Sequence, residues 1–332
     1  MRPLFLLSIA IVVIFLSACS SKKVYEPLLV KDDWKYYGNS DERVIDISSQ
    51  TALTETGKVI SKDKFIDNIS LKESYRLLGS SDGWVISANI DGNVSLQFIG
   101  DSALEEKFDL KKTIAGASIK DDILAVLFAD NEMALYSIAT KELLLKEQGN
   151  VAIVTDSRIV NPYFMNDLVL FLTLDGKVVI INSKLKKKLR TVIVSSEDYF
   201  NNIIYFNVVE NKLIAATGHK ILSMAEKEVR VSYDTRNIAY DDKNIYITTK
   251  QGEVISLTAT LEVNAKVKFP FAHFLGLIIH NDKLYALEKE GYLIELSKDL
   301  KTYDVYEADV KEGYVFVADK IFYIDDEYIS VE

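Results

Sequence analysis

The most distinctive reactive group in this sequence is the thiol of Cys19, the only cysteine among 332 residues. It follows Leu-Ser-Ala and an apolar run from Leu4 to Phe15, which in turn follows the positive charge of Arg2. A charged start, a short apolar stretch and small residues before a cleavage point are the features of a secretory signal. The apolar run is too short to cross a bilayer comfortably, since a spanning helix takes roughly 20 residues. The segment therefore predicts an exported protein.

The four residues that end at this thiol resemble the lipobox of bacterial lipoprotein signals, in which leucine and two small residues precede a cysteine. The resemblance implies cleavage between Ala18 and Cys19, transfer of a diacylglyceryl group to the Cys19 sulfur and acylation of its new amino group. Residues 1–18 would be the signal peptide and residues 19–23 a lipidated tether. Ser20 replaces the aspartate that often retains such proteins in the inner membrane, so the outer membrane is favoured. The alternative is an ordinary signal peptide or membrane anchor that ends in cysteine.

The other side chains that could perform chemistry are not spaced for it. His219, His273 and His280 lack the spacing of a zinc or iron site, and a structural or surface role suits each of them better. The sequence contains no nucleophile elbow and no phosphate-binding glycine loop. We therefore expect no enzymatic activity and no cofactor.

Three pairs of adjacent aspartates, at positions 121–122, 241–242 and 325–326, could suggest calcium. Two of the pairs fall in predicted tight turns, where aspartate is favoured for its backbone geometry, and the EF-hand pattern is missing. We expect no metal at these pairs. The basic cluster at residues 184–190 is predicted to be a solvated hairpin tip, with contact to anionic lipid headgroups or an acidic partner as the alternative.

Composition narrows the class of protein further. The net charge is −10, and the acidic residues are spread along the chain, which argues against nucleic acid as a partner. No cysteine is left for a disulfide once Cys19 is modified. Only 4 prolines and 14 glycines occur, so low-complexity linkers are absent and no internal domain boundary is visible. Residues 24–332 are predicted to form a single domain.

A repeat decides the expected fold. Short strands rich in Val, Ile, Tyr and Phe alternate with tight turns in units that begin near residues 42, 83, 122, 167, 211, 243, 282 and 313. A spacing of about 40 residues is that of a four-stranded propeller blade. We predict an all-β protein, a β-propeller of about eight four-stranded blades, with seven kept as an alternative because the first unit is irregular.

The two ends of the domain are expected to close the ring. The last unit has little chain left for an outer strand, and the apolar segment from Val24 to Val30 could supply it. Closure of this kind removes the open sheet edges that a linear array would expose. We therefore predict pairing between the N-terminal and C-terminal strands.

Aromatic residues in three predicted connections between blades are candidates for a partner-binding rim. They are Tyr163, Phe164, Tyr199, Phe200, Phe271 and Phe274. In a propeller the connections from outer strands to the next inner strands emerge on one face, so these side chains would share it. Exposed aromatic clusters on one face act as anchors for partners. The alternative is that Tyr199, Phe200, Phe271 and Phe274 pack inward between neighbouring blades.

A lipobox followed by a chain-filling set of Val/Ile-rich repeats with turns such as Asp91-Gly92 and Asp175-Gly176 resembles the BamB family and related quinoprotein-like propellers. The resemblance implies a non-catalytic scaffold, anchored by lipid to the outer membrane and facing the periplasm. It also implies that the chain is a monomer within a larger complex and that its partner is the central barrel-inserting subunit of the outer-membrane assembly machinery. Two alternatives stay open: a periplasmic enzyme or ligand binder that uses the central channel, and a surface-exposed adhesin-like lipoprotein.

Overall fold

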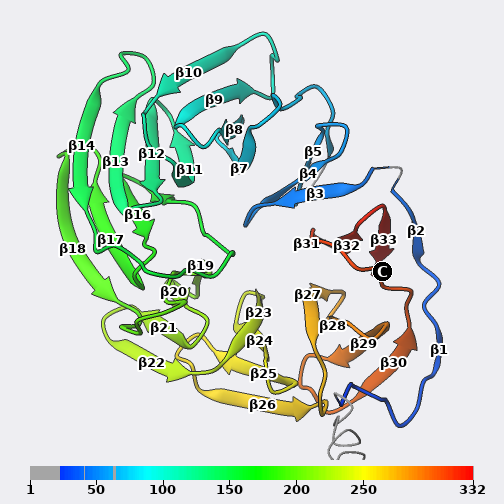
Figure 1. Cartoon of the computed structure of the whole chain (residues 1–332). Coiled ribbons are helices and arrows are strands. Elements are labelled where there is room, and N and C mark those ends of the chain that lie inside the picture. Colours follow the sequence, from blue (N-terminus) through cyan, green and yellow to red (C-terminus); the bar gives the residue numbers. More distant parts are fainter. Residues whose placement is uncertain (1–22, 41, 63–64, 332) are drawn as a thin grey trace, which may run out of the picture.

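In the computed structural model the chain forms a ring of small antiparallel sheets (Figure 1). The structure describes residues 23–40, 42–62 and 65–331, and Ala18 and Cys19 lie outside these ranges. Within these ranges there are eight blades and every regular element is a strand. No helix in this part of the chain is long and apolar enough to span a bilayer. The predicted eight-bladed, all-β propeller is confirmed.

Each blade begins with an inner strand and builds outward. The inner strands are β3 (Val44–Ile47), β7 (Arg76–Ser81), β11 (Ile114–Lys120), β15 (Tyr163–Met165), β19 (Tyr205–Val209), β23 (Thr235–Tyr240), β27 (Phe274–His280) and β31 (Val315–Val317). The second strands are β4 (Thr51–Thr54), β8 (Trp84–Ala88), β12 (Ile123–Phe128), β16 (Leu168–Leu172), β20 (Lys212–Ala216), β24 (Asn244–Thr249), β28 (Lys283–Glu288) and β32 (Ile321–Ile324).

The outer half of each blade consists of two further strands. The third strands are β5 (Val59–Ser61), β9 (Asn93–Phe98), β13 (Glu132–Ser137), β17 (Lys177–Asn182), β21 (Lys220–Met224), β25 (Glu253–Thr258), β29 (Tyr292–Ser297) and β33 (Glu327–Ser330). The outer strands of blades 1 to 7 are β6 (Phe65–Ile66), β10 (Glu105–Asp109), β14 (Leu143–Gln148), β18 (Lys187–Ile193), β22 (Glu228–Ser232), β26 (Val263–Lys268) and β30 (Tyr303–Glu307).

The hydrophobic core lies between neighbouring blades rather than at one centre. The second strands are buried on both faces, as in Phe128, Phe171 and Ile247, because each sheet packs against a sheet on either side. This explains their nearly continuous apolar sequences. The outer strands have only their inward side chains buried, such as Val192 in β18.

The hairpins between second and third strands have the turn chemistry that the sequence predicts. Gly92, Gly176 and Gly252 have φ angles of 87°, 79° and 76°, a region that only glycine occupies without strain. In each case a Cβ would also collide with nearby backbone or side-chain atoms, within 2.5 Å. These glycines therefore fix both the turn and the close approach of the connection beside it.

The ring closes by pairing between the two ends of the chain, but through a later segment than predicted. The outer strand of blade 8 is β2 (Tyr37–Asn39), which pairs antiparallel with β33. Residues 24–30 form no strand, so the assignment of closure to Val24–Val30 was wrong. Tyr25 is instead buried against blade 7, and β1 (Asp32–Asp33) adds a fifth, parallel strand to that blade. Of the apolar residues in this segment, Tyr25 packs against the blade, Leu28 and Leu29 are exposed, and none extends a sheet.

Candidate functional site

The connections from each outer strand to the inner strand of the next blade lie on one face of the ring, and the topology of the blades explains why. Inner strands of successive blades contact one another around the axis of the ring: β23 contacts β27, and β27 contacts β31. The chain therefore returns from each outer strand to the next inner strand on the same side. We call this side the connection face, defined by residues 194–204, 269–273 and 308–314 and the hairpin at residues 289–291.

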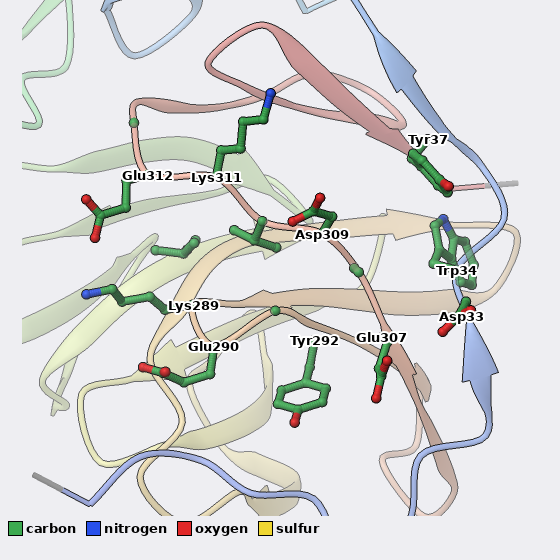
Figure 2. Close-up of a pocket in the computed structure, with 15 residues that line it drawn as sticks. Asp33, Trp34, Tyr37, Lys289, Glu290, Tyr292, Glu307, Asp309, Lys311 and Glu312 are labelled. Atoms are coloured by element: carbon green, nitrogen blue, oxygen red, sulfur yellow. The ribbon is translucent and has the colours of Figure 1, made fainter. Parts of the chain in front are cut away.

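A groove opens on the connection face between blades 7 and 8, and we call it the blade 7–8 groove. Its volume is about 950 Å³. Figure 2 shows its walls: the hairpin with Lys289 and Glu290, the connection with Asp309 to Glu312, and the N-terminal segment with Asp33 to Tyr37. Three stretches far apart in the sequence thus form one depression, and ring closure is what brings the N-terminal wall into place.

The groove combines aromatic surface with an excess of negative charge. Trp34 is buried at its base, whereas Tyr37 is 66% exposed and Tyr292 is half-buried. The carboxylates that line it are Asp33, Glu290, Glu307, Asp309 and Glu312, and no ion pair involves them within the described ranges.

The lysines of the groove neutralise this charge only in part. Lys311 already bridges Asp326 and Glu327 at 2.9 and 2.8 Å, and its hydrogen bonds to Glu327 and Asp326 raise its pKa. Lys289 is the other lysine that lines the groove. The lining therefore suits polar or basic polypeptide more than an anion.

A second, smaller depression of about 480 Å³ lies beside Tyr199. His219 contributes to its wall, and its Nδ1 lies 2.9 Å from Oδ1 of Asp234. Asp234 also accepts a hydrogen bond from Gln251, and the contacts with His219 and Gln251 lower the pKa of its carboxyl group. This histidine thus has the satisfied surface role that the sequence suggests.

The six predicted rim residues divide into two groups. Tyr199, Phe200 and Phe271 are 56%, 50% and 57% exposed on the connection face. Phe200 and Phe271 have positive φ angles of 51° and 68°, so the turns themselves present these side chains.

The other three rim candidates, Tyr163, Phe164 and Phe274, pack between blades, and of these only Phe274 was covered by the alternative interpretation. The ring of Tyr163 packs against that of Phe206 with centroids 5.0 Å apart and planes tilted by 55°, and Phe164 belongs to an apolar cluster between blades 3 and 4. Phe274 is 2% exposed. Tyr163 and Phe164 lie in β15 and Phe274 begins β27, so their placement in connections was wrong. The short run Tyr-Phe-Met directly before an Asn-Asp turn is the signal that could have identified β15 as a strand.

Groove residues such as Trp34, Tyr37 and Tyr292 were missed by the sequence reasoning. Nothing in their local pattern marks them, because the groove exists only once β1 and β2 wrap onto blades 7 and 8.

The paired aspartates have structural contacts: Asp241 accepts hydrogen bonds from the backbone of Lys243 and Asn244. Among the described residues no cluster of His, Asp or Glu could hold a metal ion, and absence of a metal stays a prediction.

The basic cluster at residues 184–190 extends beyond a hairpin tip into β18. Its cations pair with acidic groups around them: Lys184 with Asp167, and Lys188 and Arg190 with Glu147 and Glu228 of the neighbouring outer strands. These ion pairs join the outer edges of blades 3, 4 and 5.

The central channel is crossed by the connection between β14 and β15. The amide of Asn161, 6% exposed, donates to the carbonyl of Leu78 at 2.8 Å and accepts from the N–H of Ala117 at 3.2 Å. Gly79, with φ 153°, leaves the space for it, since a Cβ there would lie 2.5 Å from the Asn161 amide nitrogen. The side chain thus ties the inner strands of blades 2 and 3 together.

The same connection also reaches the opposite side of the ring. Arg158 donates a hydrogen bond to the carbonyl of Arg236 in β23. Asn202 accepts from the N–H of Asp156 at 2.6 Å and donates to the carbonyl of Arg158 at 2.8 Å. Side chains of this chain therefore occupy the space that a ligand in the channel would need.

Comparisons with known proteins give a fold and a distant relative. No protein-family model matches the chain. Plasminogen-binding protein PgbB from two Helicobacter pylori strains is 27% and 26% identical over 95% of this chain, which spans 66% of the length of those relatives.

The crystal structure of BamB from Moraxella catarrhalis superposes with a TM-score of 0.66 at 12% identity, covering 89% of this chain and 98% of that one. The C-terminal WD40 domain of Sif2 superposes with a TM-score of 0.63 at 9% identity, covering 90% of this chain and 99% of that one. The computationally designed Ika8 protein superposes with a TM-score of 0.60 at 15% identity, with the same two coverages. The chain thus has a BamB-like propeller fold.

Proposed function

We propose that this chain is a non-catalytic, protein-binding scaffold of the bacterial cell envelope, held at the outer membrane by acyl groups on Cys19. The BamB-like fold and the plasminogen-binding relatives support a protein-binding propeller. The Leu-Ser-Ala-Cys segment supports the anchor. A rigid disc with a broad face suits a scaffold.

The observation that carries this proposal is the composition of the connection face. Exposed Tyr199, Phe200 and Phe271 share it with the blade 7–8 groove, where Tyr37 stands among unpaired carboxylates. Large exposed aromatic side chains next to a charged depression are typical of protein interfaces, in which aromatic anchors supply affinity and charge supplies orientation. The excess of carboxylates favours a partner surface that carries lysine or arginine.

The finer proposal is a role in outer-membrane β-barrel assembly, with the central barrel-inserting subunit as the partner. Its support is the likeness of fold to BamB and the lipobox, which together fit a periplasm-facing scaffold.

A second candidate is binding of an extracellular protein by a surface-exposed lipoprotein. The observation that favours it is the 27% identity to the plasminogen-binding protein over 95% of this chain. A ligand in the central channel has less support, because Asn161 and Arg158 already cross that space.

Affinity purification from detergent-solubilised envelopes tests the proposal. The full-length chain, tagged at its C-terminus, is isolated together with a Tyr37→Ala/Phe271→Ala variant and a control Tyr240→Ala variant, in which an exposed aromatic residue of β23 is removed. Co-isolation of barrel-assembly subunits with the wild type and the control, but not with the double variant, supports assembly. Protease digestion of whole cells that removes the propeller supports surface exposure instead. Isolation of the chain without any protein but with a small molecule would overturn the scaffold proposal.

A further inference from the structure

The first described residues form a strap along the edge of blade 7. Tyr25 is 5% exposed, and its ring meets those of Phe269 and Tyr292 edge-on at 6.0 and 5.7 Å. Farther along, the backbone N–H of Lys31 donates to the carbonyl of Val305 in β30 at 2.8 Å. The segment between Tyr25 and Lys31 is therefore fixed to the blade at both ends.

Two large apolar side chains project from the strap between these attachments. Leu28 is 104% exposed and Leu29 is 78% exposed, the highest values among the large apolar side chains of the described ranges. Pro27 restricts the backbone just before them. An exposed Leu-Leu pair on a fixed segment is apolar surface that the fold itself leaves uncovered.

The strap begins beside one of the exposed aromatics of the connection face. The Lys23 ammonium lies 5.5 Å from the centroid of the Phe271 ring. The strap thus begins with a cation over an aromatic ring, and the sequence has a second lysine, Lys22, at the preceding position. A basic residue and an aromatic ring on the same segment as exposed leucines are the composition of protein surfaces that contact lipid headgroups.

The length of chain before the strap supplies the remaining argument. Lys23 lies four positions after Cys19, and an extended chain of four steps reaches at most about 14 Å. Acyl groups on Cys19 would hold the strap within that distance of the headgroups. This step rests on the lipid anchor of the proposed function.

We propose that the bilayer itself covers this surface: Leu28 and Leu29 enter the interfacial layer, Lys23 lies at the headgroups, and the propeller docks by the edge of blade 7. The acyl chains supply proximity and the leucine pair supplies orientation, which a flexible tether alone would not give. Because Asp33 and Trp34 follow in the same segment, docking would hold the blade 7–8 groove near the membrane, within reach of a membrane-embedded partner.

The single cysteine makes a direct test possible. Once Cys19 is acylated, an introduced cysteine is the only free thiol in the mature chain. Leu29→Cys and a control, Leu189→Cys, are labelled with an environment-sensitive fluorophore. Leu189 is 51% exposed in β18, on the opposite side of the ring from β30 (Figure 1). The lipidated proteins are reconstituted into phosphatidylethanolamine and phosphatidylglycerol vesicles that contain a nitroxide-labelled lipid as a quencher.

We expect the label at position 29 to shift to shorter emission wavelength and to lose most of its emission, while the label at position 189 changes little. Equal emission from both labels, in protein that floats with the vesicles, would overturn docking and leave the anchor intact. Protein that does not float and whose Cys19 is unmodified by mass spectrometry would overturn the anchor, and docking with it. A third outcome is that the label at position 29 is not quenched on vesicles but that position 29 crosslinks to a protein in cells. This result would overturn docking on the bilayer and assign the leucine pair to a protein partner.

Discussion

Trp34 donates its indole N–H to the backbone carbonyl of Ser330, 2.8 Å away, across 296 positions of the sequence. The ring of Trp34 also meets that of Tyr306 at 5.0 Å, so one side chain joins the N-terminal segment to blades 7 and 8. The contact closes the propeller and at the same time forms the base of the groove.

Replacement of Trp34 is therefore expected to weaken closure. Trp34→Ala should lower the free energy of unfolding by about 3–5 kcal/mol, because it removes a buried ring. Trp34→Phe keeps most of the packing, loses the N–H donor and should cost about 1 kcal/mol. Urea unfolding measures both, with Tyr199→Ala, an exposed aromatic, as the control. A Trp34→Ala protein as stable as that control would contradict closure through this residue.

The amide of Asn161 is expected to stabilise the centre of the ring. Asn161→Ala leaves the buried N–H of Ala117 and carbonyl of Leu78 without their partner and should destabilise by about 2 kcal/mol. Asn264→Ala is the matched control, since that asparagine hydrogen-bonds Asn244 at the exposed edge of blade 6 and its loss should change stability little. Equal unfolding midpoints for the two variants would show that the channel connection contributes nothing.

Glu105 predicts a pH dependence of stability. Burial raises the pKa of this carboxyl group, but hydrogen bonds from Lys72, Ser95 and Lys107 outweigh burial and hold the pKa at about 2, below its ordinary value of 4.5. A depressed pKa means that the carboxyl group is protonated at a lower pH in the folded state than in the unfolded state. Its contribution is therefore complete above pH 4.5 and is lost as pH falls toward 2.

Unfolding of Glu105→Gln across this pH range measures the effect. The variant should be about 1–3 kcal/mol less stable than the wild type at pH 7, and the difference should vanish near pH 2. Glu73→Gln, an exposed carboxylate on the preceding connection, is the control. A difference between Glu105→Gln and wild type that is independent of pH would contradict the assignment.

Removal of the thiol tests the anchor. Cys19→Ala should move the folded chain from the membrane fraction to the soluble fraction, because the acyl chains supply most of the membrane affinity. Fractionation with immunodetection, together with labelling by radioactive palmitate, measures this. A Cys19→Ala protein that stays in the membrane fraction and a wild type without label would contradict lipidation.

The architecture could be predicted from sequence because each blade repeats the same local pattern. Asp91-Gly92 and Asp175-Gly176 mark hairpins, and the strands around them carry enough β-branched and aromatic residues to be recognised. The segment from Val24 to Val30 was misassigned because its apolar residues resemble a strand, although Tyr25 packs against Phe269 instead. Local periodicity does not distinguish apolar residues that extend a sheet from those that cover its edge.

The candidate site could be predicted only in part. Tyr199, Phe200 and Phe271 are exposed as the rim hypothesis requires, and the backbone of Phe200 and Phe271 has positive φ angles that turn those two side chains outward. The blade 7–8 groove depends on contacts between the first and last blades, and no local pattern in the sequence reports such contacts. Its residues therefore became visible only with the closed ring.

The most direct test of the central claim is site-specific photocrosslinking in cells. A photoreactive phenylalanine analogue replaces Tyr37 in the groove, Tyr199 on the connection face, or Leu189 on the outer edge of blade 4 as the control. A protein scaffold that binds through the connection face predicts discrete crosslinked adducts from positions 37 and 199 and none from position 189. Adducts from position 189 alone, or none at positions 37 and 199 in folded, membrane-bound protein, would contradict the account.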